Sequence, residues 1–120
     1  MFADGTTQNT SATDIPQRRY NGQRYTLGLK DRGHHILCRD ENDEILVPYD
    51  SRVAFPIGTV ITIVNTDSSS VYINKEGGSI DMIIAGDGSY SSAELTGYGI
   101  ATLLKVGREE WVISGNVQPD

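Results

Sequence analysis

The stretch Phe55-Pro56-Ile57-Gly58-Thr59-Val60-Ile61-Thr62-Ile63-Val64-Asn65 decides the fold. It is a turn followed by the densest β-branched run in the chain, and β-branched side chains favour a pleated backbone. Pro and Gly precede the run and Asn, Asp and Ser follow it, as is typical of turns. Residues 60–64 alternate little in polarity, which is typical of a strand covered on both faces. The run therefore predicts the central strand of a small all-β domain.

Length and composition bound the classes of protein to consider. The chain has 120 residues, which is the typical size of a single domain and enough to bury a hydrophobic core. Its formal net charge of −6 argues against nucleic acid as a partner, because phosphate binding needs a basic surface. No apolar run is long enough to cross a bilayer, so no membrane partner is expected. The single cysteine, Cys38, is expected to be a buried hydrophobic residue rather than a reactive thiol.

Short apolar or alternating segments recur at intervals of about ten residues, separated by turn clusters. They predict strands at 25–29, 34–38, 45–48, 71–74, 79–84, 89–95, 100–106 and 110–114. The last two are joined at 107–109 and carry a clear hairpin signal. No stretch has a helical period over the needed length, which disfavours parallel βαβ folds. We expect a small antiparallel β-sandwich or barrel, jelly-roll-like, over residues 24–120.

The first 23 residues differ in character from this body. Residues 5–13 are polar without an apolar period, so they cannot repay the entropy of ordering by themselves. We expect residues 1–23 to form an extended N-terminal arm, either a disordered tail or a segment that becomes ordered on a neighbouring subunit. The candidate docking residues of this arm are Phe2, Ile15, Pro16, Arg18, Arg19 and Tyr20.

Few residues suggest chemistry. His34 and His35 are adjacent on a predicted strand and would point to opposite faces, so they cannot chelate one metal together. The acidic stretch from Asp40 to Glu44 could bind a cation, but it lacks the EF-hand spacing, and a solvated turn is the favoured interpretation. No nucleophile, paired acids or phosphate-binding loop stands in a recognisable setting. We therefore expect no enzymatic activity, no metal site and no cofactor.

A series of structural motifs follows along the body. They are Tyr25-Thr26-Leu27 with Leu29, Asp31 and Gly33; Val47-Pro48 followed by Phe55-Pro56-Ile57-Gly58-Thr59; Val71-Tyr72-Ile73; and Tyr98-Gly99-Ile100-Ala101-Thr102-Leu103-Leu104-Lys105-Val106 with Trp111-Val112-Ile113-Ser114-Gly115. In this order they resemble a small β-domain that recurs in virion proteins of tailed bacteriophages, especially tail-fibre and other surface structural proteins. The motifs consist of turns, strand cores and a packing Trp, and they span nearly all of the body.

The resemblance implies a virion structural protein, located at the particle surface and made in the host cytoplasm. A self-contained β-domain with a short arm favours a capsid decoration (cement) protein. It would be a homotrimer at local threefold positions, holding the major capsid protein through its arm. The alternative is a tail-fibre or tail-tip module that contacts other tail proteins and the host surface. Its candidate host-binding residues are Tyr49, Tyr72, Tyr90 and Tyr98, although a packing role is the favoured interpretation for each.

Overall fold

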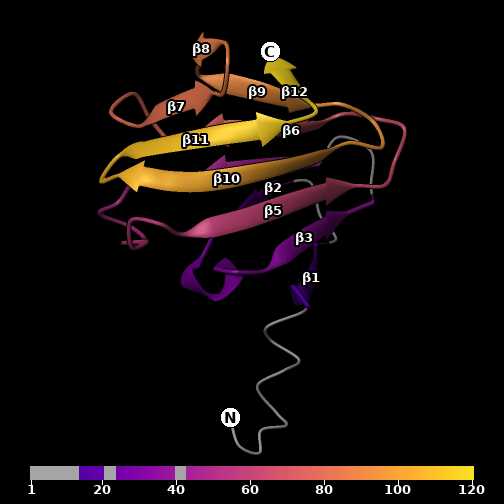
Figure 1. Ribbon diagram of the computed structural model, residues 1–120, viewed down its shortest axis with the longest axis horizontal. Coiled ribbons are helices and arrows are strands. Elements are labelled where there is room, and N and C mark those ends of the chain that lie inside the picture. Colours follow the sequence, from indigo (N-terminus) through magenta and orange to yellow (C-terminus); the bar gives the residue numbers. More distant parts are fainter. Residues whose placement is uncertain (1–13, 21–23, 40–42) are drawn as a thin grey trace, which may run out of the picture.

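The computed structural model describes residues 14–20, 24–39 and 43–120, which form two stacked β-sheets (Figure 1). Sheet A has seven strands in the order β1 (Gln17–Tyr20), β3 (His35–Cys38), β5 (Val60–Asn65), β10 (Ile100–Gly107), β11 (Glu110–Gly115), β7 (Asp81–Ile84) and β8 (Gly88–Ser89). Sheet B has five strands in the order β12 (Val117–Pro119), β9 (Ser92–Leu95), β6 (Val71–Lys75), β4 (Glu44–Val47) and β2 (Arg24–Thr26). One 3-10 turn, η1 (Leu29–Asp31), follows β2. The predicted small all-β sandwich is confirmed.

Both sheets are mixed, whereas the sequence led us to expect antiparallel pairing. β1, β3 and β5 run parallel in sheet A, and β2, β4 and β6 run parallel in sheet B. Successive strands from β1 to β7 alternate between the two sheets. Among β1 to β6, each parallel neighbour is thus reached through one strand of the opposite sheet, which replaces the helix that usually makes such a crossover. This is why a chain without a helical pattern can still form parallel pairs.

The core lies between the inner faces of the two sheets. Alternate residues of each strand point inward, and those of β5, β6 and β10 are almost wholly inaccessible. The rings of Phe55 and Trp111 pack edge to face with 5.4 Å between their centroids. Cys38 is fully buried, as predicted for a small hydrophobic residue.

The strand that decides the fold is covered on one face only. β5 lies between β3 and β10, and its inward residues Ile61 and Ile63 are fully buried. On its outer face, however, Val60 is 41% exposed. The expectation that both faces are covered is therefore wrong for residues 14–20, 24–39 and 43–120, because these residues provide one opposing layer and it lies on the inner side.

The structure adds a strand at each end of the folded body. Residues 17–20 were predicted as arm but form β1, so sheet A begins before residue 24. Residues 117–119 belong to no predicted strand but form β12 at the edge of sheet B. The predicted strand 89–95 divides, with β8 in sheet A and β9 in sheet B. The remainder of the predicted arm, residues 1–13, lies outside the described residues.

Candidate functional site

The outer face of sheet B is polar and internally hydrogen-bonded. Glu44 on β4 accepts hydrogen bonds from Arg24 (3.1 Å) and Asn74 (2.5 Å), which lie on the flanking strands. Glu94 on β9 accepts from Ser70 and Gln118 in the same manner. These hydrogen bonds, with Ser70 contributing most, lower the pKa of Glu94. This polar ladder suits a sheet face that stays in contact with water.

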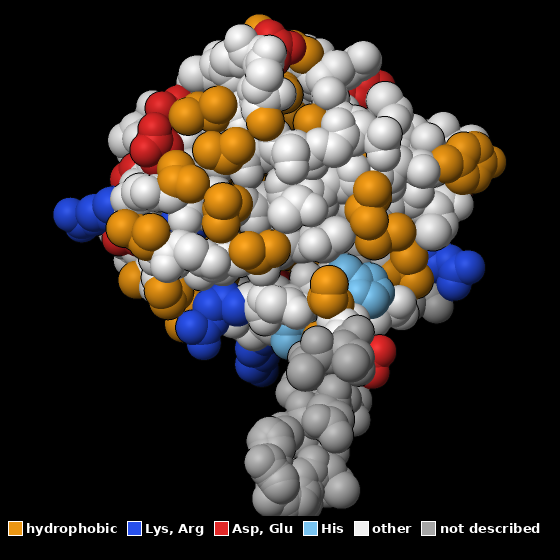
Figure 2. All heavy atoms as spheres, viewed as in Figure 1, with side chains coloured by type: hydrophobic (Ala, Val, Ile, Leu, Met, Phe, Trp, Pro, Cys, Tyr) orange, Lys and Arg blue, Asp and Glu red, His pale blue; other side chains and the backbone are white. Residues whose placement is uncertain are grey.

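The outer face of sheet A has a different composition, organised in rows that cross the strands. The large apolar row aligns Val60, Leu104, Val112 and Ile83 across β5, β10, β11 and β7. The small apolar row aligns Leu37, Val64 and Ile100 across β3, β5 and β10. The hydroxyl row, with Thr62, Thr102 and Ser114, runs between them. Figure 2 shows the hydrophobic side chains of this face gathered in two groups.

Several of these apolar side chains are open to solvent. Leu104 is 37% exposed and Ile100 is 49% exposed on the same strand. Val106 continues β10 beyond the large apolar row, and Ile57, in the turn before β5, is the most exposed of the apolar residues here. A shallow hollow of about 440 Å³ adjoins this end of the row, between the turn at 32–33 and residues 56–60. Contiguous exposed apolar surface of this kind marks interaction sites on soluble proteins.

Charged side chains lie at the margins of this face. In the described parts of β3, β5, β7, β10 and β11, the outward titratable residues are His35, Asp81 and Glu110. Asp81 on β7 and Glu110 on β11 lie opposite each other in the strand register, at one corner of the face. His35 lies opposite Thr62, at the β3 end of the hydroxyl row. The two apolar rows contain no charge. Depletion of charge at the centre of a surface, with charge at its rim, is typical of protein interfaces.

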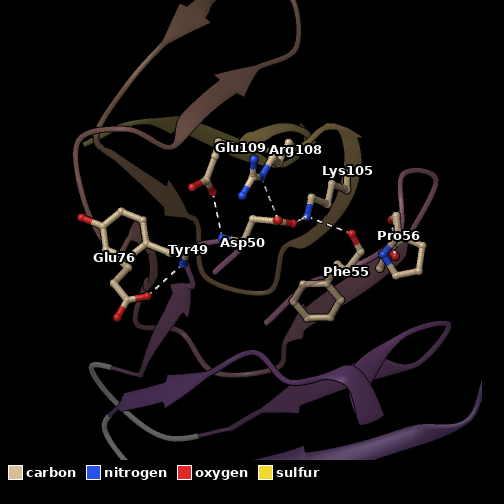
Figure 3. Close-up of polar contacts among 9 residues, drawn as sticks. Tyr49, Asp50, Phe55, Pro56, Glu76, Lys105, Arg108 and Glu109 are labelled. Carbon is tan, nitrogen blue, oxygen red and sulfur yellow. Dashed lines mark hydrogen bonds and ion pairs between the residues drawn. The ribbon is translucent and has the colours of Figure 1, made fainter. Parts of the chain in front are cut away.

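A buried ion-pair cluster supports this face from within (Figure 3). Lys105 points inward from β10 with 2% of its surface exposed, and its Nζ donates to the carboxylate of Asp50 (2.5 Å) and the carbonyl of Phe55 (2.8 Å). Arg108 Nε contacts the other Asp50 oxygen at 3.2 Å. The backbone N–H of Asp50 donates to the Glu109 carboxylate. The cluster therefore fixes the segment that leads into β5, which is a structural role.

The described part of the predicted arm attaches to the domain itself. The carbonyl of Pro16 accepts a hydrogen bond from the His35 backbone N–H at 2.9 Å. Ile15, immediately before β1, is 58% exposed. Arg19 and Tyr20 are part of β1, but their side chains are outside the described part of the structure, as is the whole of Phe2.

Arg18 is the predicted arm residue with a specific side-chain partner. Its Nε lies 2.7 Å from Oδ1 of Asp31, which is fully buried at the end of η1. Asp31 also accepts hydrogen bonds from the Tyr25 hydroxyl and the Gly28 backbone N–H. Burial, and then the hydrogen bond to Asp31, raise the pKa of Tyr25. A basic residue expected to contact another chain thus joins β1 to the turn that follows β2.

The candidate host-binding tyrosines are not brought together. Tyr49 and Tyr90 are half-buried against the core, and the Tyr90 hydroxyl donates to Asp87 at 2.7 Å. Tyr72 is half-buried on the outer face of sheet B. Tyr98 is 76% exposed in the loop between β9 and β10, with a left-handed backbone at φ +62°. Of the four, Tyr98 is thus the one presented to a partner.

Comparison with known proteins identifies no relative: no family model matches the chain, and no curated protein matches it. Within residues 14–20, 24–39 and 43–120, no three His, Cys, Asp or Glu side chains are placed to hold a metal ion. The same part of the chain contains no helix that is long and apolar enough to cross a bilayer. Of the predicted acidic loop, residues 40–42 lie outside these ranges, while Asp43 is buried and Glu44 belongs to the polar ladder.

Sequence reasoning did not identify the outer face of sheet A as a site. The signal was present as near-continuous apolar runs at 60–64 and 100–106. We interpreted the first run as a strand covered twice within the domain. Within the part of the chain that the structure describes there is no second cover, so these outward residues form a surface.

Proposed function

We propose that this chain is a non-enzymatic structural protein of a tailed-bacteriophage virion, specifically a capsid decoration protein that binds the major capsid protein. The observation that carries the proposal is the outer face of sheet A, which is apolar and poor in charge while the face of sheet B is polar. A rigid β-domain with one such face is suited to assembly. The motif resemblance supports the virion as the place of that assembly.

In this proposal residues 1–13 make the contact with the capsid and the β-domain associates as a homotrimer. The polar segment precedes β1, which is at the edge of sheet A. The exposed Ile15 lies at the junction between the two parts. An extended segment that adds to a neighbour's sheet edge gains affinity from backbone hydrogen bonds, without requiring any catalytic group. Symmetric closure around a local threefold axis is a common state for proteins of this kind.

Deletion of residues 1–13 tests the role of the arm. Because β1 begins at Gln17, this deletion keeps the pairing with β3 and the contact between Arg18 and Asp31. We expect the shortened chain to keep its melting temperature and to lose binding to undecorated capsids. A variant with residues 5–13 in scrambled order serves as the control for length and composition. Full occupancy of capsids by the shortened chain would contradict the proposed role.

The number of copies per particle distinguishes the capsid from the tail. Hundreds of copies, measured by quantitative mass spectrometry of purified particles, would support decoration of the head. A few dozen copies or fewer would contradict decoration and support a position in the tail.

One observation favours the second candidate, a tail-fibre or tail-tip module that binds the host surface. Tyr98 is an exposed aromatic residue in a strained loop conformation, and such residues occur at recognition sites. In this case Tyr98→Ala should reduce binding of the chain to host cells, while Tyr72→Ala on the outer face of sheet B should not. Equal binding by both variants would contradict this candidate.

A further inference from the structure

We propose that the outer face of sheet A is the contact surface between copies of this chain, with the large apolar row of one copy packed on the small apolar row of the next. Three copies then close around an axis that runs along the hydroxyl rows. This inference rests on the proposed function, because it names the partner that covers the assembly surface.

The first argument is that the strands of this face have the composition of strands that are buried on both faces. β5 and β10 are apolar on both sides, a composition found in strands that are buried on both faces. In the described chain only their inner side has a cover. Sheet B shows how this chain composes a face that remains in water, with carboxylates, amides and hydroxyls hydrogen-bonded to one another. The contrast implies that the cover of sheet A comes from outside the described residues, and we infer that a second copy provides it.

The second argument concerns charge. The chain carries a formal net charge of −6, so most of its surface repels a second copy. The apolar rows of sheet A carry no charge, and Asp81 and Glu110 lie together at one corner of the face. Contact through these rows therefore brings two copies together where their repulsion is weakest.

The third argument is size. With about 4.8 Å between strands and about 3.3 Å per residue, the strands from β3 to β7 and the length of β10 outline a face of roughly 600 Å². Side-chain relief increases the accessible area beyond this outline. Stable interfaces bury about 800 Å² per partner. In the closed ring each copy divides this face between two neighbours, so the area that one copy buries in both contacts together is of the same order as in one standard interface.

The arrangement of the rows favours a ring over a face-to-face pair. A face-to-face pair would bury Thr62 and Thr102 at the centre of the contact, where their hydroxyls would need new hydrogen-bond partners. In a ring the hydroxyl rows line the axis, where water can reach them. Each copy then uses one apolar row toward each neighbour, which is a heterologous contact that closes on itself.

The mass of the full-length chain in solution tests the proposal. Sedimentation equilibrium of the wild type should give the mass of three chains of 13.1 kDa each. Leu104→Lys places a charge in the large apolar row at a position already 37% exposed, so the fold should persist while the mass falls to one chain. Leu46→Lys is the matched control, because Leu46 points outward from sheet B. A wild-type mass of one or two chains, or a trimeric Leu104→Lys variant, would overturn the inference.

Cross-linking tests which rows meet. Copies with Leu104→Cys mixed with copies with Ile100→Cys should cross-link through a short bismaleimide, because position 104 is in the large row and position 100 in the small row. Leu104→Cys alone should not cross-link. The native Cys38 contributes little background because it is fully buried. A dimer formed by Leu104→Cys alone would contradict the arrangement.

Capsid binding of the same variants separates this inference from the proposed function. A wild type that binds capsids but remains monomeric would overturn the contact between copies, and with it the homotrimer, while leaving the proposed binding to the capsid standing. A trimer that fails to bind any phage particle would overturn the proposed function and leave the contact between copies standing.

Discussion

Lys105 joins two segments of the chain that are distant in sequence. It lies on β10, its ammonium group contacts Asp50 and the carbonyl of Phe55, and its Nζ is 6.0 Å from the centre of the Trp111 ring. A buried ammonium group is tolerated because it is paired and hydrogen-bonded. The consequence is that the turn before β5 has one position relative to the hairpin of β10 and β11.

Asp50→Asn should lower stability in a pH-dependent manner. The hydrogen bond from Lys105, followed by that from Arg108, lowers the pKa of Asp50 below its ordinary value of 3.8. A lowered pKa in the folded state contributes stability above the ordinary value, and this contribution is lost as the pH falls through the lowered pKa. Melting curves should therefore show the wild type above the variant at neutral pH and converging with it below pH 3.8. An equal difference at neutral and acidic pH would contradict the assignment.

Gly58→Val should destabilise the fold by about 1–3 kcal/mol, through the backbone rather than through a clash. Gly58 has φ +95°, a conformation that a β-branched residue adopts only with strain, and a Cβ built there would meet nothing within 4 Å. Its N–H also donates to the carbonyl of Lys105 at 2.8 Å. Urea denaturation measures the loss. Gly78→Val is the control, because Gly78 has open space and no positive φ; an equal loss in both variants would rule out backbone strain as the cause.

At the scale of elements, β1 is an edge strand with β3 as its one partner in the sheet. It pairs with β3 over four residues, and the described contacts hold it further through Arg18 and Asp31. Its place in the sheet has a functional consequence, since the segment proposed to reach the capsid leaves the domain at this strand.

Arg18→Ala should loosen β1 without unfolding the domain. Removal of the guanidinium leaves Asp31 with the Tyr25 hydroxyl and the Gly28 N–H, so η1 should persist. Hydrogen exchange of the β1 amides should become faster by roughly an order of magnitude, while that of β5 stays unchanged. Arg24→Ala is the control, because Arg24 forms a largely exposed pair with Glu44. Unchanged exchange in β1 would show that backbone pairing alone holds the strand.

At the scale of the whole molecule, the alternation of strands between the sheets couples the two layers. Every step from β1 to β7 crosses from one sheet to the other, so neither sheet is a continuous piece of chain. Loss of one sheet would therefore remove the strands that connect the parallel neighbours of the other sheet.

This coupling predicts a single cooperative unfolding transition. Amides of β6 in sheet B and β10 in sheet A should report the same free energy of opening in native-state hydrogen exchange. The fluorescence of Trp111, which is 2% exposed in sheet A, should change together with the far-UV circular dichroism on urea titration. Two separate transitions would show that the sheets unfold independently.

Local patterns were sufficient for the positions of most strands. The β-branched run at 60–64 and the hairpin signal at 107–109 each identified a strand or turn that the structure contains. The edge strands β1 and β12 were missed, since three or four residues are too few to show a pattern and these strands exist because an edge of a sheet is available to pair with them. Gly58 was recognised as a turn residue, but its positive φ required the structure.

The sequence by itself determined that the protein is all-β and which side chains share a face, because side chains alternate with a period of two along any strand. It could not determine which strands lie side by side or in which direction, since backbone hydrogen bonds are the same for every sequence. Only the tertiary structure decided that strands alternate between the sheets, that Arg18 contacts Asp31 within the same chain, and that one apolar face remains uncovered. The pattern of β5 is typical of a strand buried on both faces, but the described residues cover only its inner face.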